Sequence, residues 1–305
     1  MMGYQEPSLR PGKLPQKLLE QMLSVIDRRD QRVRLWPSIG EDATAIDFGD
    51  TSLIASSDPV TFASDLIGWY AVHVNANDIA ACGGEPRWFM ATVLLPDYSS
   101  SYVPSKIFNQ IREASESLNV SVVGGHTEIT QNVKMPIVSG VMLGEASANA
   151  PISTTGVQVG DDILLTKGVA IEGTALLARE MPSQLGAAGM SRNMLEKAAN
   201  YLFDPGISVL PESRIARTHP GVHAMHDPTE GGLATGLYEL ASAAKVGILV
   251  NTEAVNIYKE SDEVCKRLGI SPWGLLASGA LLIAVSPAHS DQLVLALSNA
   301  GIGAT

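Results

Sequence analysis

The sequence lacks the cysteine content and the basic charge on which several classes of protein depend. Its 305 residues include two cysteines, Cys82 and Cys265, which is too few for a disulfide framework or a cysteine zinc site. A reducing cytoplasm is therefore the expected compartment. Lysine and arginine together number 21 against 32 aspartates and glutamates, and the net charge of −11 argues against a nucleic-acid partner.

Long apolar runs are also missing. The longest, residues 273–285, contains glycine and serine and is too short to cross a membrane, so we expect a buried strand there. The polar residues 1–13 have no signal-peptide core, and we expect neither export nor a membrane partner. Walker A, Rossmann, kinase and Gly-x-Ser-x-Gly motifs are absent, so any nucleotide site must use another architecture.

The residues that are abundant indicate an α/β protein. The hydrophobic fraction is 45%, the aromatic fraction is 5%, and 28 glycines supply tight turns around an aliphatic core. In the first half, apolar periodicity predicts helices at 15–29, 66–81 and 106–119 and strands at 53–55, 88–95, 120–123 and 136–143. This alternation predicts a first α/β domain, residues 1–148.

A second domain is expected to span residues 149–305, after a junction rich in small and turn residues at 144–160. Its predicted strands are 162–166, 248–250 and 280–285, and its predicted helices are 171–179, one capped by Ser191, 229–245 and 291–299. Residues 301–305 are typical of a turn into a further strand, so we expect the last strand of this domain to be truncated.

Four aspartates lie in similar surroundings: Asp42 in Gly-Glu-Asp-Ala, Asp58 in Ser-Asp-Pro, Asp78 in Asn-Asp-Ile-Ala and Asp227 in Asp-Pro-Thr-Glu-Gly-Gly. Each follows or precedes an apolar segment, where strand ends and helix starts deliver side chains to a cleft. Clustered carboxylates need a cation, and Mg²⁺ prefers such oxygen ligands and commonly accompanies nucleotide phosphates. One such aspartate is more often a turn or capping residue. Four together favour a shared Mg-ATP site.

Further candidates flank these motifs. We expect Gly124, Gly125, His126 and Thr127 to form a loop after a strand, where backbone N–H groups and a hydroxyl approach an anion. The histidine is a candidate metal ligand, phosphate donor or proton shuttle, or else an ordinary hydrogen-bonded loop residue. Asn77 offers an uncharged amide beside one of the aspartates.

The histidines near Asp227 predict no zinc site. His223 and His226 are three residues apart, but no third ligand has convincing spacing. Asp227 itself precedes the helix predicted at 229–245, so it either caps that helix or joins a metal to phosphate at the helix N-terminus.

The motifs, in this order, resemble the aminoimidazole ribonucleotide synthase (PurM-like) superfamily. This superfamily includes the hydrogenase-maturation carbamoyl dehydratases (HypE), thiamine-monophosphate kinase and selenophosphate synthetase. The resemblance covers nearly the whole chain and is carried by residues 12–15, 40–43, 57–59, 77–80, 124–127, 227–232 and 278–282. The Gly-Lys-Leu-Pro and Asp-Pro-Thr-x-Gly-Gly segments are most similar to the HypE branch.

The resemblance implies a two-domain α/β (α+β) fold in which the N-terminal domains of a homodimer pair into an intersubunit β-barrel. ATP would bind near that barrel. The carboxylates of Asp42, Asp58, Asp78 and Asp227 would hold Mg²⁺. The phosphates would lie near Asn77, Gly124, Gly125, His126 and Thr127, and Lys13 would close over them.

The activity implied is ATP-dependent phosphorylation of an oxygen of an amide, carbonyl or related substrate, with a hydrogenase-maturation partner protein. Such transfer needs positioning and charge neutralisation more than a protein nucleophile. Two features depart from the HypE pattern: no cysteine follows Cys265, and residues 167–173 replace an Asp-His-Gly segment. The alternatives are an aminoimidazole ribonucleotide synthase or thiamine-monophosphate kinase activity, a nucleotide-binding assembly or sensor protein without turnover, and a structural dimer.

Overall fold

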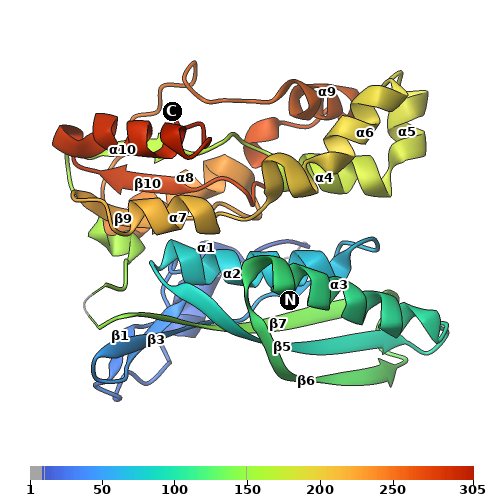
Figure 1. Cartoon of the computed structure of the whole chain (residues 1–305), viewed down its shortest axis with the longest axis horizontal. Helices are drawn as coiled ribbons and strands as arrows, with labels where there is room; N and C mark the ends of the chain where they lie inside the picture. Colours follow the sequence, from blue (N-terminus) through green and yellow to red (C-terminus); the bar gives the residue numbers. More distant parts are fainter. Residues whose placement is uncertain (1–8, 10, 149) are drawn as a thin grey trace, which may run out of the picture.

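The computed structural model describes residue 9, residues 11–148 and residues 150–305. The chain forms two α/β halves that lie one above the other (Figure 1). No helix among the described residues is long and apolar enough to cross a membrane.

The first half is built on a seven-stranded sheet. Its elements are α1 (Gln16–Leu23), β1 (Val33–Leu35), β2 (Thr44–Asp47), β3 (Thr51–Ser56), β4 (Pro59–Val60), α2 (Ile67–Ala81), β5 (Glu85–Pro96), α3 (Tyr102–Leu118), β6 (Ser121–Thr130) and β7 (Ile137–Ser147). The strand order is β1-β2-β3-β7-β5-β6, with β4 also paired to β7. The pairs are antiparallel except β5 with β6.

Helix α2 lies between this sheet and the second half (Figure 1). Every residue of α2 except Trp69 is buried, as expected for a helix covered on all sides. Its polar residues Asn75, Asn77 and Asp78 are therefore inside the protein, where each side chain needs a specific partner. In contrast, α1 contributes no buried residue.

The second half is built on a three-stranded antiparallel sheet of order β8-β10-β9. Its elements are η1 (Thr154–Gly156), β8 (Asp162–Leu165), α4 (Ile171–Glu180), α5 (Pro182–Ala187), α6 (Arg192–Asn200), η2 (Leu202–Gly206), α7 (Leu210–Ala216), β9 (Val222–His226), α8 (Gly232–Ala244), α9 (Lys259–Leu268), η3 (Pro272–Gly274), β10 (Leu282–Val285) and α10 (Pro287–Asn299). Ser191 caps α6, as predicted, by accepting from the Met194 N–H.

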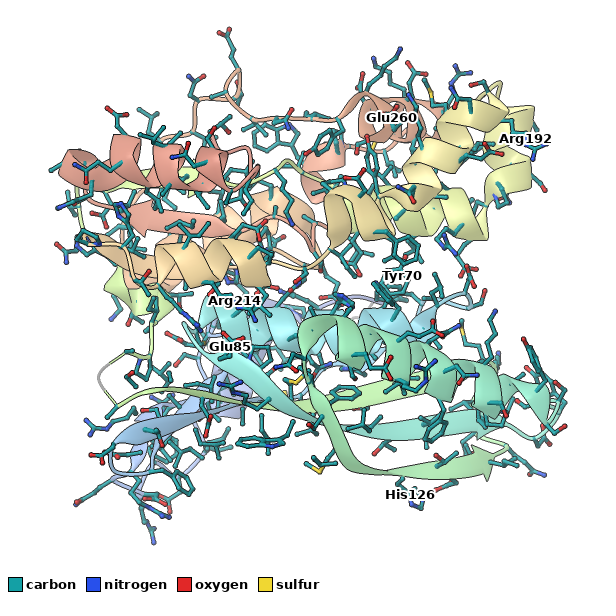
Figure 2. The ribbon with its side chains drawn as sticks, in the orientation of Figure 1. Tyr70, Glu85, His126, Arg192, Arg214 and Glu260 are labelled. Atoms are coloured by element: carbon teal, nitrogen blue, oxygen red, sulfur yellow. The ribbon has the colours of Figure 1, made fainter. Side chains whose placement is uncertain are left out.

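The two halves share their packing. Ile171 and Ile207 of the second half belong to the same apolar cluster as Ile54 and Phe89 of the first. At the rim of this boundary, Arg214 and Arg217 both donate to Glu85, and Figure 2 shows Glu85 and Arg214 facing each other there. Side chains from both halves are thereby held at fixed positions around the cleft between them.

The expected mixed α/β architecture in two domains is confirmed, and most predicted elements are present. The strand predicted at 248–250 is wrong. These residues have no regular structure, and Leu249 is fully exposed because the sheet of the second half does not extend to this segment.

The loop predicted at 124–127 is also wrong, because strand β6 continues through it to Thr130. A bulge at Val123 interrupts the pairing with β5, and the strand resumes at Gly124. Gly125 has a φ of 147°, and a Cβ there would lie 2.1 Å from the carbonyl oxygen of Ala91. This glycine therefore permits close approach of two strands, a role that sequence alone does not separate from anion binding.

Candidate metal and phosphate site

A cavity of about 740 Å³ lies between the two halves. This volume is typical of small-molecule sites. Its lining is strongly acidic, and the carboxylates that line it are Glu41, Asp42, Asp58, Asp78, Glu230 and Glu239. Lys13 and His226 are the basic side chains that line it among the described residues. An anionic ligand therefore needs an accompanying cation to enter.

Asp58 lies in the short turn between β3 and β4, and α2 fixes its backbone. The Asn75 side chain accepts a hydrogen bond from the Asp58 N–H at 2.8 Å and donates to the Asp58 carbonyl at 3.1 Å. Burial raises the pKa of the Asp58 carboxyl, and the nearby charges of Glu230 and Asp42 raise it further. The fixed backbone thus presents a carboxyl that is costly to ionise without a cation.

Asp78 is delivered from the last turns of α2. Only 5% of its surface is exposed, and the Ser56 hydroxyl donates to it. Burial raises its pKa well above the ordinary range, and the charges of Asp58, Asp227 and Asp42 add to this shift. Because the charges of the other three predicted aspartates all act on Asp78, the four carboxyl groups lie near one another.

Asp227 directly follows strand β9 and is 1% exposed. Neither of its carboxylate oxygens has a hydrogen-bond partner within the described chain. Burial, followed by the charge of Asp42, raises its pKa well above the ordinary range. Helix α8 starts at Gly232 without a side-chain cap, so Asp227 is not a capping residue. A buried carboxylate without a partner is the kind of group that a metal cation satisfies.

Asp42 precedes β2 and is joined to the second half through His226. The ring Nδ1 of His226 donates to Asp42 Oδ2 at 2.9 Å, and its Nε2 donates to Glu239 Oε2 at 3.2 Å. Burial alone would lower the pKa of His226, but Asp42 and Glu239 raise it to about 10. Lys13 in turn donates to Glu239 Oε1 at 3.0 Å.

The donor set suits a cation that keeps some non-protein ligands. No group of three His, Cys, Asp or Glu side chains in the described parts of the chain is close enough together to hold a metal ion by itself. Mg²⁺ in phosphate-transfer sites commonly takes one or two protein carboxylates and completes its shell with phosphate oxygens and water. The carboxylates of Asp78 and Asp227 fit this mode of binding.

The other predicted residues fall into two groups. Lys13 lines the cavity. The Asn77 amide instead bridges the halves, donating to the Ile207 carbonyl at 2.8 Å and accepting from the Val209 N–H at 2.9 Å. Its side chain is therefore not free to approach a phosphate.

The segment from Gly124 to Thr127 lies outside the cavity. It belongs to the exposed edge strand β6, and the side chain of His126 points away from the second half (Figure 2). Within one protomer, these residues do not join the aspartates.

Sequence reasoning missed three residues that organise the site, namely Asn75, His226 and Glu239. For His226 the available signal is its place next to Asp227, but the spacing of His223 and His226 indicates only a zinc ligand, not a partner of an aspartate. Glu239 occupies an ordinary position on a predicted helix, so no sequence signal identifies it.

A second cavity, of about 600 Å³, lies in the second half between β8, α8 and residues 246–251. Its lining is largely aliphatic, including Leu164, Leu233 and Ile248. It lacks the carboxylate set of the first cavity, so the cavity between the halves is the better candidate for a metal and phosphate site.

Comparison with known proteins identifies the class. The profile of the AIR synthase related protein N-terminal domain matches residues 40–146, and that of the corresponding C-terminal domain matches residues 158–305. The chain therefore belongs to the AIR synthase related, or PurM-like, family. Within this family it is similar to HypE proteins.

The relatives support this placement. A carbamoyl dehydratase HypE from Cupriavidus necator is 25% identical over 322 residues, covering 99% of this chain and 87% of its own. A hydrogenase expression/formation protein of Methanocaldococcus jannaschii is 27% identical over 258 residues, covering 83% and 73%.

Solved structures share the fold. The match in a HypE–HypF complex has a TM-score of 0.73 at 21% identity, covering 92% of this chain and 88% of its own. A HypE crystallised with ATP has a TM-score of 0.64 at 22% identity, covering 84% and 75%.

Proposed function

We propose that this chain is an ATP-dependent, Mg²⁺-requiring enzyme that phosphorylates an oxygen of an amide or carbonyl substrate, as a HypE-like protein. One observation carries the proposal: Asp42, Asp58 and Asp78 line a single cavity, and the carboxylate of Asp227, which has no hydrogen-bond partner among the described residues, lies beside them. The crystallised relative that binds ATP has the same fold and supports the choice of nucleotide.

The acidic and basic side chains at the cavity would have different roles in the reaction. Bound Mg²⁺ would neutralise the triphosphate and stabilise charge as the phosphoryl group transfers. Asp78 and Asp227 would hold the cation, and Asp42 and Asp58 would supply further carboxylate oxygens to it at the same cavity. Lys13 lies at the cavity with its Nζ on Glu239 and is placed to approach a phosphate oxygen.

For the acceptor we propose a carbamoyl or related amide oxygen, because several relatives are named carbamoyl dehydratases. The oxygen attacks the γ-phosphorus, and ADP leaves with the electrons of the broken bond. The oxygen then leaves as inorganic phosphate with the electrons of the broken C–O bond, while the amide nitrogen gives up its two protons, so the amide loses the elements of water.

The proposal predicts that Mg-ATP stabilises the protein and that Asp78→Asn removes this effect. Nucleotide at 100 times its Kd would raise the free energy of unfolding by about 2.7 kcal/mol. Thermal unfolding with ATP, Mg²⁺ or both measures it. The Asn variant should fold as well as wild type, since it removes like-charge repulsion, yet lose roughly 100-fold or more in turnover. Full activity in this variant, or no Mg-ATP stabilisation of wild type, contradicts the proposal.

We also propose that the protein forms a homodimer through β6. Nine of the ten residues of this strand are exposed, including the apolar Val122, Val123 and Ile129. An exposed apolar edge strand favours pairing with another chain. Pairing of β6 would also bring His126 and Thr127 against the partner. Sedimentation at micromolar concentration tests this, and a monomer there argues against it.

The HypE–HypF complex supports a maturation protein as a further partner.

A further inference from the structure

A continuous chain of four charged groups crosses the boundary between the halves. Lys13 Nζ lies 3.0 Å from Glu239 Oε1, Glu239 Oε2 lies 3.2 Å from His226 Nε2, and His226 Nδ1 lies 2.9 Å from Asp42 Oδ2. The chain connects the N-terminal segment to helix α8, then to the end of β9, and finally to the turn before β2. It uses both nitrogens of the ring, so the imidazole has no rotational freedom left.

The two central groups are well buried. His226 is 2% exposed and Glu239 is 7% exposed. The turn before β2 is also packed tightly against α8, because a Cβ on Gly40 would lie 3.1 Å from the Glu239 carbonyl oxygen. Since backbone packing already holds these segments together, the ring is not needed merely to join them. Its hydrogen bond to Asp42 therefore has a further effect.

This further effect is on the orientation of the Asp42 carboxylate. The ring binds Oδ2 and makes no hydrogen bond to Oδ1, and the Asp42 side chain, which is 12% exposed, lines the cavity together with Asp58 and Asp78. An aspartate side chain rotates freely unless something fixes it. A fixed carboxylate binds a cation more tightly because no rotational freedom is lost on binding.

We propose that His226 is a positioning residue that fixes the Asp42 carboxylate for cation binding, with Glu239 holding the opposite side of the ring. This inference rests on the proposed function, since it assigns the orientation of one carboxylate within that same site. It adds a role for a histidine and a glutamate that the aspartate motifs do not assign.

Two substitutions at position 226 separate the two contacts. The amide nitrogen of asparagine lies close to the place of ring Nδ1, so His226→Asn keeps the donor to Asp42 and loses the one to Glu239. Glutamine reaches the place of Nε2, so His226→Gln keeps the donor to Glu239 and loses the one to Asp42. Both variants are neutral, so each loses the same charge.

The measurement is Mn²⁺ binding, followed by the electron paramagnetic resonance of the free ion, with and without a non-hydrolysable ATP analogue. We expect His226→Gln to weaken binding by about 10–100-fold and His226→Asn to stay much closer to wild type. Thermal unfolding without cation serves as the control, and there the two variants should lose similar stability.

A double-mutant cycle tests whether the ring acts through Asp42. Asp42→Asn alone should weaken Mn²⁺ binding, and adding His226→Gln to it should cause no further loss. Additive losses overturn the inference, as does equal weakening by the Asn and Gln variants or unchanged binding in the Gln variant. Absence of Mn²⁺ binding in the wild type itself, with or without nucleotide, overturns the proposed function and this inference with it.

Discussion

Buried carboxyl groups dominate this protein at the scale of single residues. Asp78 and Asp227 are almost fully buried, and burial raises the pKa of each. A group of this kind has two ways to avoid an uncompensated charge: it takes a proton, or it binds a cation. At the proposed site Mg²⁺ and protons would therefore compete for the same oxygens, and cation binding should weaken as the pH falls.

Glu172 provides a pH-dependent test away from the aspartates. It lies in the first turn of α4, and burial raises the pKa of its carboxyl from 4.5 to about 7. Between these values the folded protein binds more protons than the unfolded chain, so the free energy of unfolding falls as the pH rises. Above pH 7 the loss reaches its full size, at most roughly 3 kcal/mol.

Glu172→Gln stays neutral and should escape this loss. We expect the variant to match wild type near pH 4 and to be more stable near pH 8, as measured by urea unfolding across that range. Equal stability of the two proteins at pH 8 would show that the Glu172 carboxyl ionises without penalty.

At the scale of elements, two asparagines on opposite sides of helix α2 have different structural roles. Asn75 holds the backbone of Asp58, while Asn77, two residues later, bridges to the carbonyl of Ile207 and the N–H of Val209. Both amides are completely buried. One side of the helix therefore serves the cavity and the other serves the boundary between the halves.

Alanine at either position should remove buried hydrogen bonds and cost roughly 2–4 kcal/mol of stability. Only Asn75→Ala releases Asp58, so we expect it to weaken Mn²⁺ binding while Asn77→Ala leaves the affinity nearly unchanged. Calorimetric titration of both variants below their unfolding temperatures makes the comparison. A selective loss of affinity in Asn77→Ala would instead support the predicted role of this residue at the phosphates.

Strand β6 offers a matched pair of glycines. Gly125→Ala would place a Cβ 2.1 Å from a backbone oxygen, whereas a Cβ at Gly124 would meet the Met90 side chain at an ordinary 3.7 Å. We expect the first variant to lose roughly 3 kcal/mol or more and the second to stay within about 1 kcal/mol of wild type. Denaturant unfolding measures both, and sedimentation shows whether the proposed dimer weakens only in the first.

The sequence predicted elements well where local patterns dominate and poorly where partners are remote. Helical periodicity at 66–81 and 106–119 matches α2 and α3 closely. The glycines at 124–125 predicted a loop. They instead belong to a strand, because they allow β5 to approach closely, and a contact between segments so far apart in the sequence leaves no local pattern. The aspartates were recognisable as a set, but their neighbourhood depends on the docking of two halves, which no local pattern contains.

The candidate site belongs to the whole molecule and to neither half alone. Asp42, Asp58 and Asp78 come from the first half, while His226 and Asp227 come from the second. A ligand bound among them must therefore stabilise both halves together.

Hydrogen exchange tests this cooperation directly. Mg-ATP should slow exchange in α2 of the first half and in β9 and α8 of the second by similar factors, because opening of either half releases the ligand. Each element contributes lining residues, among them Asp78, His226 and Glu239, so the amides that report cooperation are those of the same elements that lie away from the cavity. Protection confined to one half would show that the ligand contacts that half alone.

The N-terminal arm, residues 11–23, should affect how long a ligand stays bound at this site. Helix α1 buries none of its residues, yet Lys13 just before it is tied to Glu239 at the cavity, with 40% of the lysine side chain exposed. The lysine end of this ion pair is exposed while Glu239 is buried, and dissolved salt screens the exposed end, which should loosen the hold on the arm. The residence time of a bound molecule should then shorten as ionic strength rises, even while the two halves stay firmly closed on each other.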